Sequence, residues 1–268
     1  MSGMSHAAIV VSLHGRCGKT LLARILVDYF LLSGGRPYVF DTDSVEWKLH
    51  DLFPNEARVV DLAIARDQMV LFDTLAEASP EMRVVDLTHR SLTKFFALLR
   101  DTDFICEAKA HDIEPMIYYI PDRKLDSFEA GVVLRDNFPD CGFIIVENEF
   151  FEPPKGNVQQ SPAYSALMSH KSRFVMPRLA SEAIEVLEDR HLSLSDFMRQ
   201  GMSSTGESLA DDGLSPAIRI EFRRWVFRMF RQIHRVTTGL AAVDEPLSGF
   251  ESTPPATEPE DWGRIGSG

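Results

Sequence analysis

The chain has 268 residues, of which 44% are apolar and 25% are charged, and these proportions exclude a collagen, a coiled coil and a chain disordered throughout. Its 28 basic and 40 acidic residues give a net charge of −12, which argues against a surface coated in basic charge for nucleic acid. No apolar run reaches the roughly 18 residues that span a bilayer, and Cys17, Cys106 and Cys141 lack the spacing of zinc ligands or a disulfide framework. We therefore expect a soluble protein of a reducing cytoplasm.

Short apolar runs alternate with helical stretches from the start of the chain to about residue 190. The predicted strands cover residues 7–13, 37–40, 82–85, 116–120, 143–146 and 173–176. The predicted helices cover residues 20–32, 64–78, 91–100, 123–137, 162–170 and 181–190. Strands that alternate with helices of roughly 10 to 15 residues indicate βαβ units, so the pattern predicts an α/β fold, a three-layer sandwich with a mainly parallel sheet.

A glycine-containing turn between the first strand and the first helix carries the strongest functional signal. Its glycines allow the backbone to curl so that successive N–H groups form an anion nest at the start of a helix. In such a loop Lys19 reaches the β- and γ-phosphates of a nucleotide, and the Thr20 hydroxyl binds Mg²⁺. Because strand, turn and helix follow in the required order, we predict a phosphate-binding loop made of His14, Gly15, Arg16, Cys17, Gly18, Lys19, Thr20 and Leu21.

Polar residues follow several of the predicted strands. Asp41 and Asp43 come after the second, Asp86 after the third and Asn148 after the fifth, and each also has the alternative role of a turn or cap residue. We interpret His89 as a helix cap. The polar stretch with Asp101, Asp103 and Glu107 is expected to be a solvated face.

The loop departs from the usual motif, G-x-x-x-x-G-K-[ST], because position 13 is Leu13 and the glycine stands at Gly15. In this form it resembles the deviant Walker A loop, K-G-G-x-G-K-[ST], of the ParA/MinD superfamily of ATPases. The resemblance continues in order, over roughly residues 7–200, through Val39-Phe40-Asp41-Thr42-Asp43, Arg83-Val84-Val85-Asp86 and Phe143-Ile144-Ile145-Val146-Glu147-Asn148.

This resemblance implies a P-loop fold, ATP and Mg²⁺ as cofactors, and an ATP-dependent homodimer. Thr20, Asp41 and Asp86 would serve the metal, and Asn148 would read the adenine edge. Asp43 would position the attacking water, a role suited to a loose transition state in which electrostatics dominate. The expected catalytic set is Lys19, Asp43 and Arg16.

Within the superfamily, the chain most resembles the TraL-like and MobD-like accessory ATPases of conjugative and mobilisable plasmids, with the StbB-like plasmid proteins close behind. Besides the segments above, the likeness rests on Phe174-Val175-Met176-Pro177-Arg178-Leu179 and on Leu192-Ser193-Leu194-Ser195-Asp196-Phe197. It implies a role in plasmid transfer or partition in a bacterial cytoplasm, with association to the nucleoid or to the membrane left open.

Two positions differ from the family pattern. The lysine that reaches the partner's nucleotide in the family is replaced by His14, and the second glycine by Arg16. Arg16 is one candidate for the cation supplied to the partner, because a guanidinium is always charged and binds phosphate through two hydrogen bonds. In the alternative, neither residue replaces the lysine and ATP-driven dimerisation is lost or slow.

The last part of the chain divides into a basic helix and an acidic tail. The helix, predicted over residues 214–236, has six arginines and one acid, and its apolar residues recur at intervals of three and four. The tail, residues 241–268, has six acids, one arginine, four prolines and four glycines, and is predicted to be disordered. We place a P-loop ATPase domain at residues 1–240.

Three roles are open for the basic helix. It packs on the domain with its arginines solvated, or it contacts DNA phosphates nonspecifically, or it docks on a membrane or a partner protein. The helix carries a charge of +5 and the tail −5, so the rest of the chain carries −12 and any DNA contact is expected on the helix.

Together these features favour an ATP-binding switch protein with slow Mg²⁺-dependent hydrolysis, acting in plasmid conjugation, mobilisation or partition. One alternative is a nucleotide-binding scaffold without turnover, favoured if His14 cannot replace the lysine. Another is a metabolic enzyme on the same fold, similar to dethiobiotin synthetase, for which the sequence shows no second motif.

Overall fold

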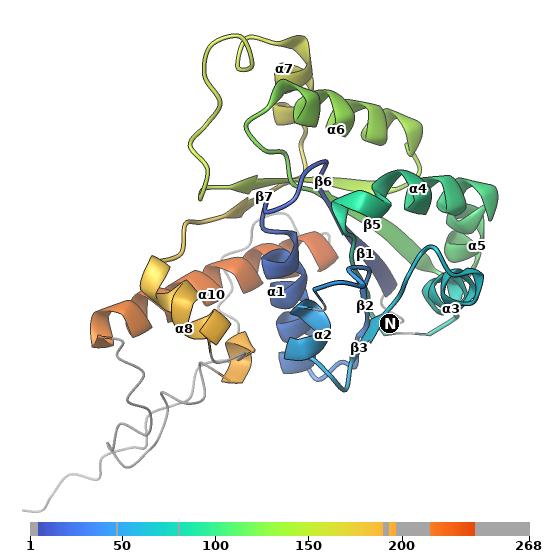
Figure 1. Ribbon diagram of the computed structural model, residues 1–268, viewed down its shortest axis with the longest axis horizontal. Coiled ribbons are helices and arrows are strands. Elements are labelled where there is room, and N and C mark those ends of the chain that lie inside the picture. The colour runs from blue at the N-terminus through green and yellow to red at the C-terminus, as the bar shows by residue number, and fades with distance from the viewer. Residues whose placement is uncertain (1–4, 47, 80, 190–192, 197–214, 239–268) are drawn as a thin grey trace, which may run out of the picture.

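The computed structural model describes residues 5–46, 48–79, 81–189, 193–196 and 215–238 (Figure 1). Its strands form one parallel sheet in the order β3-β2-β4-β1-β5-β6-β7. In chain order they are β1 Ser5–Val11, β2 Tyr38–Asp41, β3 Ala57–Val59, β4 Arg83–Asp86, β5 Ile113–Tyr119, β6 Gly142–Asn148 and β7 Arg173–Met176. The buried strand β1 therefore lies at the centre of the sheet.

Helices cover both faces of the sheet (Figure 1). One layer contains α1 Lys19–Leu32, α2 Lys48–Leu52, α8 Ser181–Asp189 and α10 Pro216–Thr238. The other contains α3 Ala65–Ala76, α4 Leu92–Asp101, α5 Phe104–Ala110, α6 Leu125–Asn137 and α7 Pro162–Met168, with the short 3₁₀ helix η1 His89–Ser91 before α4.

Alternate residues of the central strand β1 pack against the two helical layers. Ala8 and Val10 pack with the α1 layer, while Ala7, Ile9 and Val11 pack with the layer of α3 to α7. Successive strand side chains point to opposite faces, so a strand covered on both sides must be apolar throughout. The prediction of a three-layer α/β fold with a parallel sheet is confirmed.

The sequence analysis missed three short elements, α2, β3 and α5. Strand β3 has three residues and helix α2 has five, which is too short for a periodic pattern to stand out. Helix α5 has seven residues and buries only Phe104 and Ala108, so its pattern was also too short to stand out. The exposure of Asp101, Asp103 and Glu107 on this stretch is as predicted.

Helix α10 packs its apolar face against the domain. Trp225 donates a hydrogen bond from Nε1 to the Pro177 carbonyl oxygen at 2.7 Å. The Gln232 side chain accepts from the Val175 N–H and donates to the Val175 carbonyl oxygen, so it covers the edge of β7 as a further strand would. The predicted start of this helix at residue 214 and the predicted acidic tail, residues 241–268, lie outside the described residues.

None of the helices in the described ranges combines the length and the apolar character that a membrane span requires.

Candidate functional site

The predicted phosphate loop lies between the end of β1 and the start of α1, at the carboxyl edge of the sheet. Two of its residues have the left-handed backbone, Arg16 with φ 61° and Gly18 with φ 94°. A Cβ atom on Gly18 would lie 2.8 Å from Asn148 Nδ2 and 2.8 Å from Met176 Cε, so both the backbone angle and the close approach require glycine here.

The backbone of this loop keeps its hydrogen-bond donors free. Within the described part of the chain, the N–H groups of residues 15–20 donate to no other residue, and the first bond at this end of α1 runs from the Leu22 N–H to the Gly18 carbonyl oxygen. Unpaired N–H groups at a helix N-terminus, next to left-handed residues, form the anion nest that binds phosphate. The loop is therefore prepared for an anionic ligand.

Lys19 is the first residue of α1 and is only 8% exposed. Its ammonium donates to Ser12 Oγ at 3.0 Å and to the His14 carbonyl oxygen at 3.1 Å. Burial lowers the pKa of Lys19, and the nearby charge of Asp86 offsets only part of this effect. An anion bound in the loop would remove that penalty.

Thr20, in the first turn of α1, lies next to Asp86 at the end of β4, and its hydroxyl donates to Asp86 Oδ2 at 2.6 Å. Burial, together with the nearby Asp41 and Asp43, raises the pKa of Asp86 to about 7, against the opposing effects of the bond from Thr20 and the charge of Lys19. A hydroxyl and a buried carboxylate with acidic neighbours are oxygen ligands that suit Mg²⁺. The donor set fits the metal implied by the sequence resemblance.

Asp41 has a different environment from the one expected of a metal ligand. Its Oδ1 accepts from the Asp43 N–H at 3.0 Å, and its Oδ2 accepts from the N–H groups of Leu49 at 2.9 Å and His50 at 3.3 Å. Oδ2 therefore holds the start of α2, and Oδ1 holds the turn after β2. The neighbouring Asp43 accepts from Val45 and Glu46, which fixes its side chain in the turn after β2.

Asn148 links the end of β6 to the phosphate loop. Its Nδ2 donates to the Cys17 carbonyl oxygen at 3.0 Å, and its Oδ1 accepts from the Phe150 N–H at 3.0 Å. The side-chain amide that was predicted to read adenine thus bonds to the loop on one side and to its own turn on the other.

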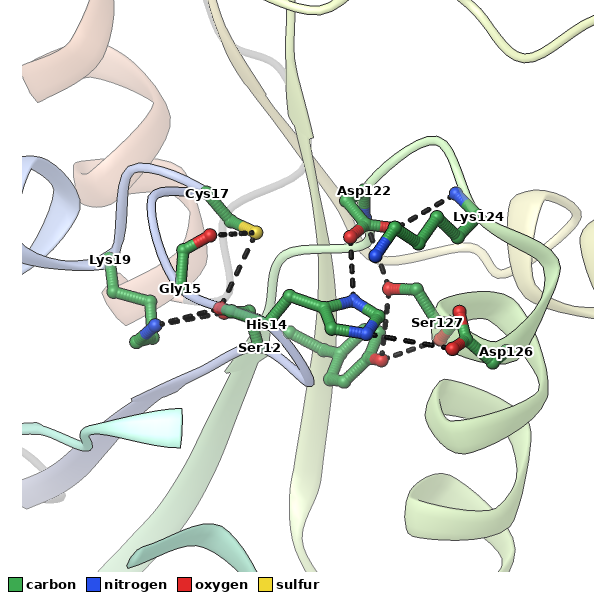
Figure 2. A network of polar contacts seen from close by, with 10 residues as sticks. Ser12, His14, Gly15, Cys17, Lys19, Asp122, Lys124, Asp126 and Ser127 are labelled. Atoms are coloured by element: carbon green, nitrogen blue, oxygen red, sulfur yellow. Dashed lines mark hydrogen bonds and ion pairs between the residues drawn. The ribbon is translucent and has the colours of Figure 1, made fainter. Parts of the chain in front are cut away.

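His14 faces its own chain at the loop's outer edge. Its Nδ1 lies 2.6 Å from Asp122 Oδ2, and its Nε2 lies 3.5 Å from Asp126 Oδ2 (Figure 2). The partners follow β5 and begin α6, which the sequence analysis did not connect with the loop. No local signal links them, because residues 14 and 122 are far apart in the chain.

His89 also lies against the loop and is not the helix cap that the sequence analysis proposed. The cap position of η1 is Thr88, and a Cβ atom on Gly15 would lie 3.3 Å from the His89 ring. Burial lowers the pKa of His89, and the positive charge of Lys19 lowers it further. His89 therefore lies beside the candidate site, as its position shortly after β4 could have indicated.

The parallel sheet and the loop after its central strand together have the architecture of a P-loop nucleotide-binding fold. Comparison with known proteins found no matching family model and no matching curated protein. Similar solved structures include a chain of the MinC:MinD cell division protein complex of Aquifex aeolicus, with a TM-score of 0.49 and 11% identity over 90% of this chain and 98% of that one.

A McdA–ATP complex from Cyanothece is similar with a TM-score of 0.43 and 13% identity, covering 91% of this chain and 100% of that chain. A nucleotide-binding protein in complex with ADP from Archaeoglobus fulgidus has a TM-score of 0.41 and 13% identity, over 71% of this chain and 87% of that chain.

Proposed function

We propose that this protein is an ATP-binding switch of the ParA/MinD type with slow, Mg²⁺-dependent hydrolysis. The observation that carries the proposal is the phosphate loop, where the N–H groups of residues 15–20 are unpaired within the described chain and where Lys19 is buried. These groups and Lys19 would hold the β- and γ-phosphates and stabilise the charge that develops during transfer to water.

Thr20 and Asp86 are the residues we assign to the metal, because their side-chain oxygens already meet at 2.6 Å. Mg²⁺ bound there would neutralise charge on the phosphates. We assign Asp41 to positioning, because its Oδ1 accepts from the turn after β2 and its Oδ2 from two N–H groups of α2. Asp43, held in the next turn, is the residue we assign to orienting water.

Asn148 is assigned to the loop rather than to the adenine edge. Its bond to the Cys17 carbonyl oxygen fixes the loop against β6, and the close packing on Gly18 leaves no room for a side chain between them. The nucleotide-binding set is therefore the backbone of residues 15–20, with Lys19 and Thr20 as side-chain ligands.

Replacement of Lys19 tests the binding site. Among the described residues of the loop, Lys19 is the only buried side-chain cation. Lys19→Ala should therefore weaken ATP binding by about tenfold to a hundredfold. Lys94→Ala, at an exposed position on α4, is the matched control. Equilibrium binding of a fluorescent ATP analogue with Mg²⁺ measures both, and equal affinity in the two variants would contradict the proposal.

A nucleotide-binding scaffold without turnover is the second candidate, and the contacts of His14 favour it. His14 stands where the superfamily's lysine reaches a partner, yet its imidazole contacts Asp122 and Asp126 of its own chain. Measurement of phosphate release with and without DNA separates the two functions. Turnover that DNA stimulates supports the switch, and binding without turnover supports the scaffold.

The setting in plasmid conjugation, mobilisation or partition is proposed from the sequence resemblance to TraL-like, MobD-like and StbB-like proteins. An exposed row of arginines on α10, formed by Arg224, Arg228, Arg231 and Arg235, is the surface we propose for DNA phosphates. The apolar face of the same helix is buried in the domain, so the exposed arginine face is the one we propose for contact with DNA.

A further inference from the structure

Three potential metal-ligating side chains gather at the outer edge of the phosphate loop, apart from Thr20 and Asp86. They are His14 in the loop, Asp122 after β5 and Asp126 in the first turn of α6 (Figure 2). One ring nitrogen and one oxygen of each carboxylate all lie within 4.8 Å of one another. The cluster joins two segments that are far apart in the sequence.

The carboxylate of Asp122 is oriented by bonds behind it. Its Oδ1 accepts from the Lys124 N–H at 2.8 Å, and its own N–H donates to Ser127 Oγ at 3.0 Å. The buried Ser127 is held in turn by Tyr119, whose hydroxyl donates to the Ser127 carbonyl oxygen at 2.5 Å. Oδ2 is left facing His14 (Figure 2). Supporting bonds of this kind hold the ligands of protein metal sites in place.

The backbone of His14 is also fixed. Its carbonyl oxygen accepts from Ser12 Oγ at 2.6 Å and from Lys19 Nζ at 3.1 Å. The contact between Nδ1 and Asp122 at 2.6 Å is close but is not aligned as a hydrogen bond. A single imidazole thus faces two carboxylates, which leaves the cluster negative even when the ring is protonated.

One imidazole nitrogen and two carboxylate oxygens suit Zn²⁺ and the related divalent transition metals better than Mg²⁺, which prefers oxygen alone. Bonds of about 2.0 to 2.2 Å place tetrahedral ligand atoms roughly 3.3 Å apart. The contacts at 2.6 and 3.5 Å involve different nitrogens of the His14 ring, and a single ion binds only one of them. Closing the site therefore requires side-chain rotations that bring both carboxylates to one ring nitrogen, and the three ligand atoms already lie within 4.8 Å of one another.

We propose that His14, Asp122 and Asp126 form a site for a divalent transition-metal ion of the Zn²⁺ class, with water completing the coordination. The bound ion ties the phosphate loop to the start of α6. The site does not depend on nucleotide binding, and it occupies the position from which the superfamily's lysine would leave the loop.

Metal titration of the full chain without nucleotide tests this site. Zn²⁺ is titrated against a chromophoric chelator, and Co²⁺ is added separately to record the visible absorption of a nitrogen- and oxygen-ligated ion. We expect one ion bound per chain. Asp126→Asn, at a side chain 58% exposed, should weaken Zn²⁺ binding by at least about tenfold, and His14→Ala should abolish stoichiometric binding.

His170→Ala is the matched control, because His170 lies before β7 and outside the cluster. It should bind Zn²⁺ as the unchanged protein does. Absence of stoichiometric binding, or binding that survives both Asp126→Asn and His14→Ala, would overturn the proposal. Because no nucleotide is present, neither outcome depends on whether the protein binds ATP.

Discussion

At the scale of single residues, the site combines charges that are costly to bury with partners that offset only part of the cost. Lys19 bonds to two neutral oxygens, and Asp86 receives one bond from Thr20. Such groups destabilise the nucleotide-free protein, and the phosphate and metal that we propose to bind here would give them their full partners. Because the raised pKa of Asp86 reflects this cost, the pH dependence of stability measures it.

We predict that the nucleotide-free protein becomes less stable as pH rises from about 4 to about 7. Because burial raises the pKa of Asp86 from 3.8 to about 7, the folded state keeps a proton that the unfolded state has lost in this range, so stability falls between these pH values and levels off above about pH 7. The contribution of Asp86 is at most about 4 kcal/mol. Asp28 and Asp41, whose pKa values burial also raises, add to the same trend.

Asp86→Asn should therefore flatten the pH dependence and stabilise the nucleotide-free protein at pH 8, while it weakens Mg²⁺-dependent nucleotide binding. Urea unfolding at pH 5 and pH 8 gives the comparison. Asp73→Asn, at an exposed position on α3, should leave the dependence unchanged. An equal slope in both variants would show that Asp86 carries no such cost.

At the scale of secondary-structure elements, α10 illustrates how packing selects among roles that a sequence leaves open. Phe222, Trp225, Met229, Phe230 and Ile233 are 5% exposed or less. This apolar face is already buried in the core. It is not available to enter a membrane, because moving it there would remove the apolar contacts that α10 makes with the α1 layer. Arg224, Arg228, Arg231 and Arg235, spaced by four, three and four residues, remain on the outer face.

We predict that this outer face binds DNA through phosphates. The double variant Arg224→Gln and Arg228→Gln removes two exposed charges, so it should weaken binding and reduce the slope of log affinity against log salt by about 2. Fluorescence anisotropy with duplexes of unrelated sequence, across a salt series, measures both quantities.

The control for this variant is Lys94→Gln with Lys109→Gln, two exposed positions in the layer on the opposite face of the sheet. The control should bind DNA with the salt slope of the unchanged protein. If the arginine variant behaves in the same way as the control, α10 serves packing alone.

At the scale of the whole molecule, the ATP-dependent dimer that the sequence resemblance implies would require a residue that reaches across to a second copy. His14 contacts its own chain, whereas Arg16 is exposed and holds φ 61°, an angle that disfavours residues other than glycine. A strained residue at a binding loop is consistent with a functional constraint. Arg16 is thus the loop cation we assign to the partner's nucleotide.

We predict that ATP with Mg²⁺ converts the unchanged protein from monomer to dimer, and that Arg16→Ala prevents this without loss of ATP binding. Arg16→Gly should have the same effect while relieving the backbone strain, which separates charge from conformation. Sedimentation velocity with and without ATP gives the result. Arg36→Ala, at an exposed position before β2, is the control, and dimers of both Arg16 variants would exclude the proposed contact.

The sequence by itself determined the layered fold and the place of the phosphate loop. Both follow from the order of local patterns along the chain. An apolar strand is followed by a turn with glycines, and then by Gly18, Lys19 and Thr20 at the start of a helix. A parallel sheet then brings the ends of neighbouring strands to one edge, which is why Asp86 could be expected beside Thr20.

Only the tertiary structure decided what the side chains contact. The pairing of His14 with Asp122, the bond from Asn148 to the loop and the burial of α10 against β7 all join segments distant in the chain. Likewise the carboxylate of Asp41 bonds to α2, an element too short to recognise in advance. The physical reason is that periodicity reports which face of an element is buried, whereas side-chain partners depend on how separate elements meet.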